Sequence, residues 1–212
     1  MKDKSYFIVF EGMDGCGKTS QMMMAANYVF GLKRFDPMLL TREPTFRAQG
    51  KKIWHLLRVD LDPMAKARKF LKLYFNDRKE HLKKDILPVL KNKNSVVLCD
   101  RYKYSTCAIQ QAQGIPFREI EGMHKQLIVP GLVLIFDVPV ETACARMKND
   151  LKRKSAHKFE QKEIMKKIKV NYLALKKQLP SENIVVIDAD RPKDEVFRVV
   201  RKEIDKLIGI ER

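Results

Sequence analysis

The stretch "FEGMDGCGKTS", residues 10 to 20, places three glycines, one lysine and one threonine directly after the apolar run Tyr6–Phe10. Residues 12 to 19 fit the spacing G-x-x-x-x-G-K-[ST] in full, between a predicted strand and a predicted helix. Glycines let backbone N–H groups converge on an anion without a Cβ in the way. The first turn of the following helix adds unsatisfied N–H groups and a positive dipole end. The stretch therefore predicts a phosphate-binding loop.

The residue types of this loop indicate a nucleoside triphosphate as its ligand. Lys18 supplies a compact positive charge to the β- and γ-phosphates, and the hydroxyl of Thr19 is a ligand for Mg²⁺. Phosphate loops occur in hydrolases, switches, small-molecule kinases and nucleic-acid motors, so the loop alone does not identify the acceptor. The residues predicted to contact the triphosphate are Gly12, Met13, Asp14, Gly15, Cys16, Gly17, Lys18 and Thr19.

Short apolar runs recur along the chain and predict strands. They are Tyr6–Phe10, Ser95–Cys99, Leu132–Phe136, Ile184–Ile187 and, more weakly, Met38–Thr41. Longer stretches with helical spacing lie between them; Asp62-Pro63 indicates the start of a helix that runs to about Leu90, and another is expected from Pro192 to Ile208. This alternation predicts an α/β fold: a P-loop NTPase-type parallel five-stranded sheet with helices on both faces.

A polar residue ends each predicted strand. In open α/β sheets, ligands bind just beyond the carboxyl ends of the strands. We therefore expect functional side chains among the strand-end residues Glu11, Arg42, Asp100, Asp137 and Asp188.

Length and composition limit the kinds of protein to be considered. The chain has 212 residues, 45% of them hydrophobic and 33% charged, which suits one soluble globular domain spanning residues 1–212. The formal net charge of +17 favours anionic ligands, through either a lysine-rich solvated surface or a dedicated polyanion groove.

Cysteine usage and hydropathy indicate a cytoplasmic protein. The apolar stretch Leu127–Phe136 is interrupted by Pro130 and Gly131 and cannot span a bilayer, and the first ten residues are too short for a signal peptide. The cysteines are scattered without metal-ligand spacing, which argues against a zinc site or a disulfide framework. They are Cys16, Cys99, Cys107 and Cys144.

Three segments predict a second anion site. "TREPT" (41–45) places Arg42 just past a strand, "LYFNDRKEH" (73–81) places Tyr74 and Arg78 one helical turn apart, and "VVLCDRYKYSTCAIQ" (96–110) ends a strand in Asp100 before Arg101. Arginine forks suit phosphate, aromatic faces suit bases, and a strand-end aspartate is the usual second partner of phosphate-loop Mg²⁺. Singly, each has a structural alternative: an Arg42–Glu43 surface pair, a core tyrosine, or an Asp100–Arg101 ion pair.

Together and in this order, these segments resemble the thymidylate kinase family. That family shows a phosphate loop, then T-R-E-P, then L-x-Y-x-x-D-R-x-x-H with a proline, then D-R-Y-x-x-S with a downstream glutamine. The matching residues here are 41–44, then 73–81 with Pro88, then 100–105 with Gln110. "IDADRP" (187–192) is similar to the family's final loop around adenine, and the resemblance covers roughly the whole chain.

The resemblance implies transfer of the γ-phosphoryl group of ATP to dTMP with Mg²⁺, in a homodimer. Tyr74 would stack on thymine, Arg78 would contact the base or the acceptor phosphate, and Arg101 would hold that phosphate with help from Arg42. Asp14 would lie near the deoxyribose 3′-hydroxyl and the metal. The other residues implied are Thr19 and Asp100 at the metal, Arg146 and Ala189 at adenine, and Glu43, Tyr102, Ser105, Thr106, Ile109 and Gln110 at the acceptor.

Two departures from the family pattern bear on mechanism and specificity. Gly15 stands where some members carry an arginine, so the resemblance implies a cation in a mobile lid, about residues 148–161, supplied by Arg153 or Lys158. Ile109 stands where many members have tyrosine. Isoleucine forms no hydrogen bond, so we expect a preference for dTMP with looser discrimination against ribose.

Two other functions stay open. One is a kinase of another nucleoside monophosphate such as dUMP or UMP. The other is a basic phosphate-loop protein that binds nucleic acid; we rank it lower because Phe159 is the one aromatic residue near the lysines that begin at 148, and those lysines recur like an exposed helix face.

Overall fold

The computed structural model describes residues 4–59, 66–149 and 162–210. Within these ranges a single parallel sheet has the strand order β2-β3-β1-β4-β5. All five predicted strands are confirmed, each longer by one or two residues at its carboxyl end or shifted by one. Their bounds are β1 Tyr6–Gly12, β2 Met38–Arg42, β3 Val96–Asp100, β4 Leu132–Asp137 and β5 Ile184–Asp188.

The register of the sheet aligns the predicted strand-end residues. Phe10 of β1 pairs with Asp100 of β3, and Asp100 pairs in turn with Arg42 of β2. Because the strands are parallel, these carboxyl ends meet at one edge, next to the loop that leaves β1.

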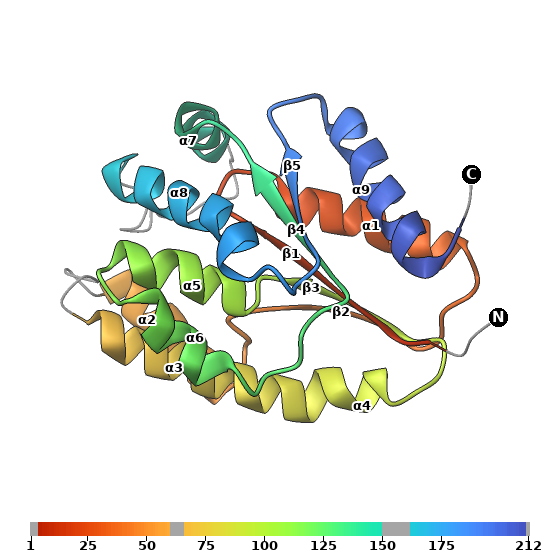
Figure 1. Cartoon of the computed structure of the whole chain (residues 1–212), viewed down its shortest axis with the longest axis horizontal. Coiled ribbons are helices and arrows are strands. Elements are labelled where there is room, and N and C mark those ends of the chain that lie inside the picture. The colour runs from red at the N-terminus through yellow and green to blue at the C-terminus, as the bar shows by residue number, and fades with distance from the viewer. Residues whose placement is uncertain (1–3, 60–65, 150–161, 211–212) are drawn as a thin grey trace.

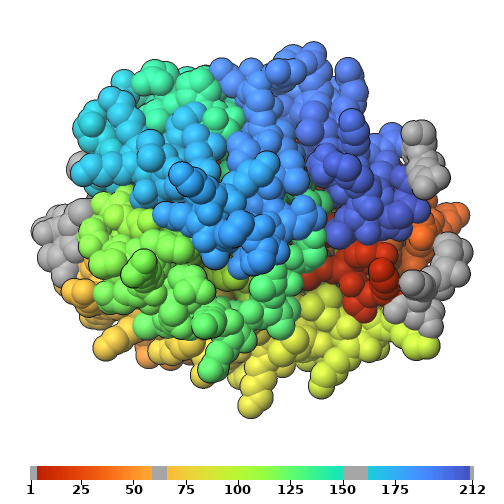
Figure 2. All heavy atoms as spheres, in the orientation of Figure 1, coloured from red at the N-terminus to blue at the C-terminus, as the bar shows by residue number. Residues whose placement is uncertain are grey.

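Helices cover both faces of the sheet, as predicted (Figure 1). On one face, α1 (Lys18–Gly31) packs against α9 (Lys193–Ile208). On the other face, α5 (Lys103–Ala112) packs against α8 (Lys162–Gln178), and Figure 2 shows α5 and α6 in green beside α8 in blue. The remaining α-helices that the structure describes beyond α4 are α2 Ala48–Val59, α3 Ala67–His81, α6 Phe117–His124 and α7 Val140–Lys148.

The long predicted helix is one continuous rod with a wide turn inside it. It consists of α3, the π-helical turn η1 (Leu82–Ile86) and α4 (Leu87–Leu90). Pro88 has no N–H for the carbonyl of Lys84, which accounts for a wider turn just before it. The predicted start at Asp62-Pro63 lies outside the described residues.

α2 is not predicted by the sequence pattern. Its large apolar residues are confined to the part from Ile53 onward, and among the described side chains of this helix Ile53 is the one that is fully buried. Gly50 within it is needed for packing, since a Cβ there would lie 1.9 Å from the carbonyl oxygen of Thr45.

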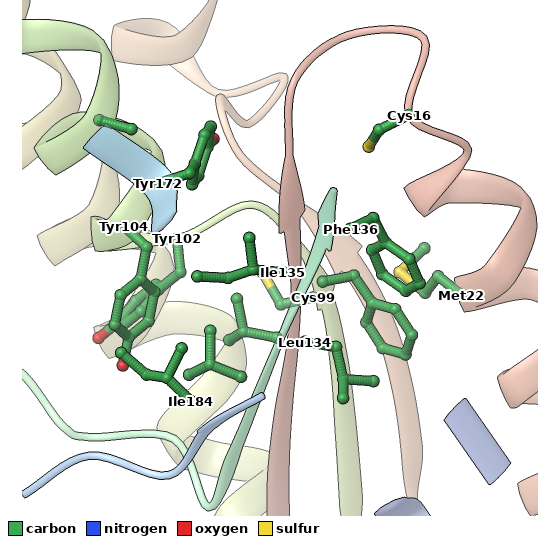
Figure 3. Packing of buried hydrophobic residues seen from close by; sticks show 14 of the residues in the cluster. Cys16, Met22, Cys99, Tyr102, Tyr104, Leu134, Ile135, Phe136, Tyr172 and Ile184 are labelled. Carbon is green, nitrogen blue, oxygen red and sulfur yellow. The ribbon is translucent and has the colours of Figure 1, made fainter. Parts of the chain in front are cut away.

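The core is divided by the sheet into two layers. Successive strand residues face opposite sides, so Phe136 packs beside Met22 of α1 while Ile135 faces Tyr102 and Tyr172 (Figure 3). The four cysteines are free thiols, three of them buried. Among the described helices, none has the length and apolar character needed to cross a membrane.

Candidate active site

The phosphate loop has the backbone geometry that its glycines predict. Gly12, Gly15 and Gly17 all have positive φ, of 140°, 80° and 91°. A Cβ at Gly15 would lie 2.4 Å from the carbonyl oxygen of Ala143 in α7, so no side chain fits there. The first turn of α1, which follows Gly17, contains no acidic residue, and its positive dipole end is left for an anion.

Lys18 arches back over this loop. Its Nζ lies 3.3 Å from the carbonyl oxygen of Met13 and 3.3 Å from Oδ1 of Asp14, and the residue is buried. The ammonium group therefore stands at the centre of the loop, where a β- or γ-phosphate would be bound.

Thr19 and Asp100, the predicted metal residues, are in direct contact. The Thr19 hydroxyl donates to Oδ2 of Asp100 at 2.7 Å. Oδ1 of Asp100 is buried and has no hydrogen-bond partner among the described residues. An orphaned carboxylate oxygen beside a loop hydroxyl is the oxygen-ligand chemistry that Mg²⁺ prefers, so these residues fit the ion.

A cavity of about 350 Å³ opens beside the phosphate loop. Every residue predicted to contact the acceptor lines this cavity. These residues come from the end of β2, from α3, and from α5 and the segment before it. Its wall also contains residues that the sequence does not predict, contributed by α2 and α8. These are Trp54, Leu57, Met165, Ile168 and Tyr172.

Arg101 lies at the boundary between this cavity and the loop. Its backbone has a positive φ of 72°, and its side chain donates to Asp14 Oδ1 at 2.5 Å, Ser105 Oγ at 2.9 Å and the Tyr172 hydroxyl at 3.1 Å. Burial disfavours the charged form of Asp14, but Arg101 and then Lys18 outweigh it and hold the pKa of that carboxyl well below its usual value. Arg101 thus pairs with Asp14, and the alternative of an Asp100–Arg101 ion pair is not what the structure contains.

Glu11 is a site residue to which the sequence analysis assigns no role. Fully buried, it accepts hydrogen bonds from the backbone N–H of Tyr102 at 2.7 Å, from the backbone and hydroxyl of Ser105 at 3.1 and 2.6 Å, and from Tyr172 at 3.1 Å. Burial raises the pKa of Glu11, and Arg101 opposes that rise. Glu11 fixes the start of α5 to β1 and, through Ser105 and Tyr172, fixes Arg101.

Arg78 is buried within a network rather than free in the cavity. Its guanidinium donates to Glu43 Oε2 at 2.7 Å, His124 Nε2 at 2.8 Å and Thr106 Oγ1 at 3.1 Å, and it lies 5.3 Å from the centre of the Tyr102 ring. Glu43 therefore pairs with Arg78, which overturns the alternative of an Arg42–Glu43 surface pair. Two of the five guanidinium N–H groups are left for a ligand.

His124 is held neutral by this network. Burial, and then Arg78, lower its pKa to about 3. Because arginine always donates, Nε2 of His124 must accept, and Nδ1 carries the proton that is donated to the carbonyl oxygen of Ile120 at 2.6 Å.

The other polar residues of the α3 motif hold the loop after β2. Asp77 accepts from the backbone and hydroxyl of Thr45 at 2.8 and 2.6 Å. His81 lies between the Thr41 hydroxyl at 2.7 Å and Glu43 at 3.1 Å. The motif D-R-x-x-H thus fixes the segment T-R-E-P-T against α3.

Tyr74 and Gln110 form part of the cavity wall. Tyr74 is half-buried there, and burial raises its pKa to about 12, so its ring is neutral. Gln110 is fully buried; its amide N–H donates to Gln113 at 2.9 Å, while its Oε1 has no partner in the part of the chain that the structure describes. Ile109 also lines the cavity and is half-buried.

A second cavity, of about 240 Å³, is lined by other residues of the phosphate loop. It joins the loop residues Cys16 and Gly17 to Arg146 and Ala189, the residues implied at adenine. Arg146 donates twice to the carbonyl oxygen of Ala189, at 3.2 and 3.1 Å. Residues of the phosphate loop therefore line both cavities.

Some residues predicted to be functional do not line either cavity. Asp137 and Asp188, at the ends of β4 and β5, pair with Lys169 and Arg191 and line neither cavity. The lid candidates Arg153 and Lys158 lie outside the described residues.

Sequence comparison identifies the family. The model of the family described as thymidylate kinase matches residues 10–200. This chain belongs to the thymidylate kinase family. It is therefore an ATP-dependent kinase, and the predicted resemblance is confirmed.

Relatives and a solved structure agree with this assignment. A probable thymidylate kinase of Pyrococcus horikoshii is 36% identical over 187 residues, covering 86% of this chain and 88% of that protein. The thymidylate kinase of Syntrophus aciditrophicus is 34% identical, covering 96% of this chain and 95% of its own. The crystal structure of the Ehrlichia chaffeensis thymidylate kinase superposes with a TM-score of 0.74 at 26% identity, covering 95% of this chain and 99% of that one.

Proposed function

We propose that this chain transfers the γ-phosphoryl group of Mg²⁺-bound ATP to dTMP, giving dTDP and ADP, and that the two cavities flanking the phosphate loop hold the two nucleotides. The observation that carries the proposal is that one loop, centred on Lys18, borders both cavities. Direct transfer needs donor and acceptor phosphates to meet in line, which two sites that share one phosphate loop allow.

On the donor side, the triphosphate would lie along the glycine backbone, with adenine in the cavity of Arg146 and Ala189. Thr19 and Asp100 would hold Mg²⁺, which supplies charge neutralisation to the phosphates when bound. The unpartnered Oδ1 of Asp100 supports this assignment.

On the acceptor side, Arg101 would hold the monophosphate, and the ring of Tyr74 would stack on the base. The unpartnered Oε1 of Gln110 supports a base with an N–H donor at its edge, which thymine and uracil offer at N3 and cytosine offers only at its exocyclic N4. The half-buried Ile109 offers no hydrogen bond to a ribose hydroxyl, so discrimination against UMP would rest on shape.

The transfer step would depend on positioned cations rather than on a covalent intermediate. A loose phosphoryl transition state is stabilised by charge at its oxygens. Lys18 would provide one such charge, and Arg153 and Lys158 would share the second. The close contact between Gly15 and Ala143 supports a cation from outside the loop, because no side chain fits at position 15. Unchanged turnover after alanine replacement at both Arg153 and Lys158 would refute that assignment.

A coupled assay of ADP release across dTMP, dUMP, UMP and dCMP tests the proposed function. We expect the highest kcat/KM with dTMP, a lower value with UMP, and the lowest with dCMP, which lacks the N3–H. Equal rates with dTMP, dUMP and UMP would overturn the thymidylate assignment in favour of a general pyrimidine monophosphate kinase.

The proposal also includes a cytoplasmic homodimer that acts without nucleic acid. Family membership and the free thiols support it. Sedimentation equilibrium would test the dimer. Binding to bulk DNA with a steep salt dependence would instead favour the hypothesis that the chain is a nucleic-acid-binding protein, which the net charge of +17 suggests.

A further inference from the structure

Arg42 differs from the other arginines that line the acceptor cavity. Arg78 pairs with Glu43 and Arg101 pairs with Asp14, both as ion pairs. Arg42 is exposed at the carboxyl end of β2, and no carboxylate among the described residues pairs with it. Its guanidinium carbon lies instead 5.5 Å from the centre of the Trp54 ring.

Trp54 presents the face of its ring to the Arg42 guanidinium. It is half-buried in α2 and lines the same cavity. Its indole N–H has no acceptor among the described residues, so no hydrogen bond fixes the ring. Phe46 packs against it nearly in parallel, with ring centres 6.5 Å apart at 14°, although Phe46 itself is 68% exposed.

The backbone that carries this stack is firmly held. Thr45, next to Phe46, is bonded to Asp77 of α3 and packs against Gly50 of α2. Arg42 is in register with Asp100, the metal residue. The stack of Arg42, Trp54 and Phe46 therefore stands at a fixed place beside the site where phosphates would meet.

We propose that Trp54 is a positioning residue that holds the Arg42 guanidinium over the acceptor cavity, with its N–H groups free for the phosphate of the nucleoside monophosphate. A tryptophan face attracts a guanidinium without occupying its hydrogen-bond donors, unlike a carboxylate. An arginine ordered in advance loses less conformational entropy when the phosphate arrives. The inference rests on the proposed function, because it needs a monophosphate in this cavity.

A double-mutant cycle in the ADP-release assay tests this coupling. Trp54→Leu should raise KM for dTMP by about 3- to 10-fold, the range of an exposed to partly buried cation–π contact, and leave kcat within about twofold. Trp54→Phe should retain part of the effect because it keeps a ring face. In the Arg42→Gln background, Trp54→Leu should change KM by less than about twofold, since the group it positions is gone. Arg58→Gln is the matched control, because it removes an exposed cation from the same helix outside the cavity.

Intrinsic fluorescence gives a second measurement, because Trp54 is the only tryptophan of the chain. Binding of dTMP should change its emission more than thymidine does, and Arg42→Gln should remove that difference. If Trp54→Leu changes KM for dTMP equally in the wild-type and Arg42→Gln backgrounds, or changes it in neither, the inference is overturned. In that case the proposed function still stands as long as the wild-type enzyme turns over dTMP. Absence of wild-type turnover with dTMP would refute the proposed function itself.

Discussion

The neutral, buried His124 predicts a specific dependence of stability on pH. In the folded protein its pKa is about 3, against 6.5 for a free imidazole. Below about pH 6.5 the unfolded chain binds a proton at this residue and the folded chain does not. Since protonation then favours the unfolded state, the free energy of unfolding falls as the pH falls, from about pH 6.5 down to the folded pKa.

The magnitude follows from the width of the interval. One pKa unit corresponds to about 1.4 kcal/mol, so between about pH 7 and about pH 5 this single imidazole removes about 2 kcal/mol of stability. This loss of stability does not depend on the exact pKa of His124 in the folded protein, as long as that pKa lies well below 5. Burial, and then the guanidinium of Arg78, both lower it.

Urea unfolding of wild type and His124→Gln at the two pH values measures the effect. A glutamine oxygen can still accept from Arg78 but does not titrate, so the variant should lose about 2 kcal/mol less than wild type. His55→Gln, on the exposed face of α2, is the control and should follow wild type. Parallel pH dependence of wild type and His124→Gln, or an imidazole NMR resonance of His124 that titrates near pH 6.5, would refute the neutral assignment.

Three further changes test the site. Tyr172→Phe removes the hydroxyl that contacts Arg101. It should lower kcat/KM for dTMP by about 3- to 30-fold and leave KM for ATP unchanged. An equal change in the KM values for dTMP and ATP would instead show a general loss of structure. Asp100→Asn should raise the Mg²⁺ concentration for half-maximal rate by about 10-fold or more in an ADP-release titration, and an unchanged value would remove Asp100 from the metal site. Arg146→Ala should raise KM for ATP by about 3- to 10-fold while KM for dTMP stays constant, and the reverse pattern would contradict the donor cavity.

Local patterns explain how much of the fold and site could be predicted. The phosphate loop is a contiguous motif, and its glycine requirement is a property of the backbone. The contact between Thr19 and Asp100 spans 81 positions, yet it follows from the rule that parallel strands end at one edge. The acceptor residues gather in one cavity for the same reason.

Residues whose role depends on convergence of several elements could not be assigned in this way. Arg78 lines the acceptor cavity as predicted, whereas its hydrogen-bond partners come from the β2 loop, α5 and α6, and no spacing in the sequence connects those segments. Tyr172 recurs at helical spacing with Met165, Ile168 and Leu175, all buried, so its sequence pattern is that of a core residue. Trp54 lies in α2, a helix that the sequence analysis does not predict, so its place beside Arg42 could not be inferred.

A crystal structure with dTMP and a non-hydrolysable ATP analogue would locate both nucleotides. We expect the triphosphate along residues 12–19, the dTMP phosphate against Arg101 and the thymine ring against Tyr74, within the cavity of about 350 Å³. Density for dTMP outside that cavity, or a phosphate turned away from Arg101, would contradict this expectation.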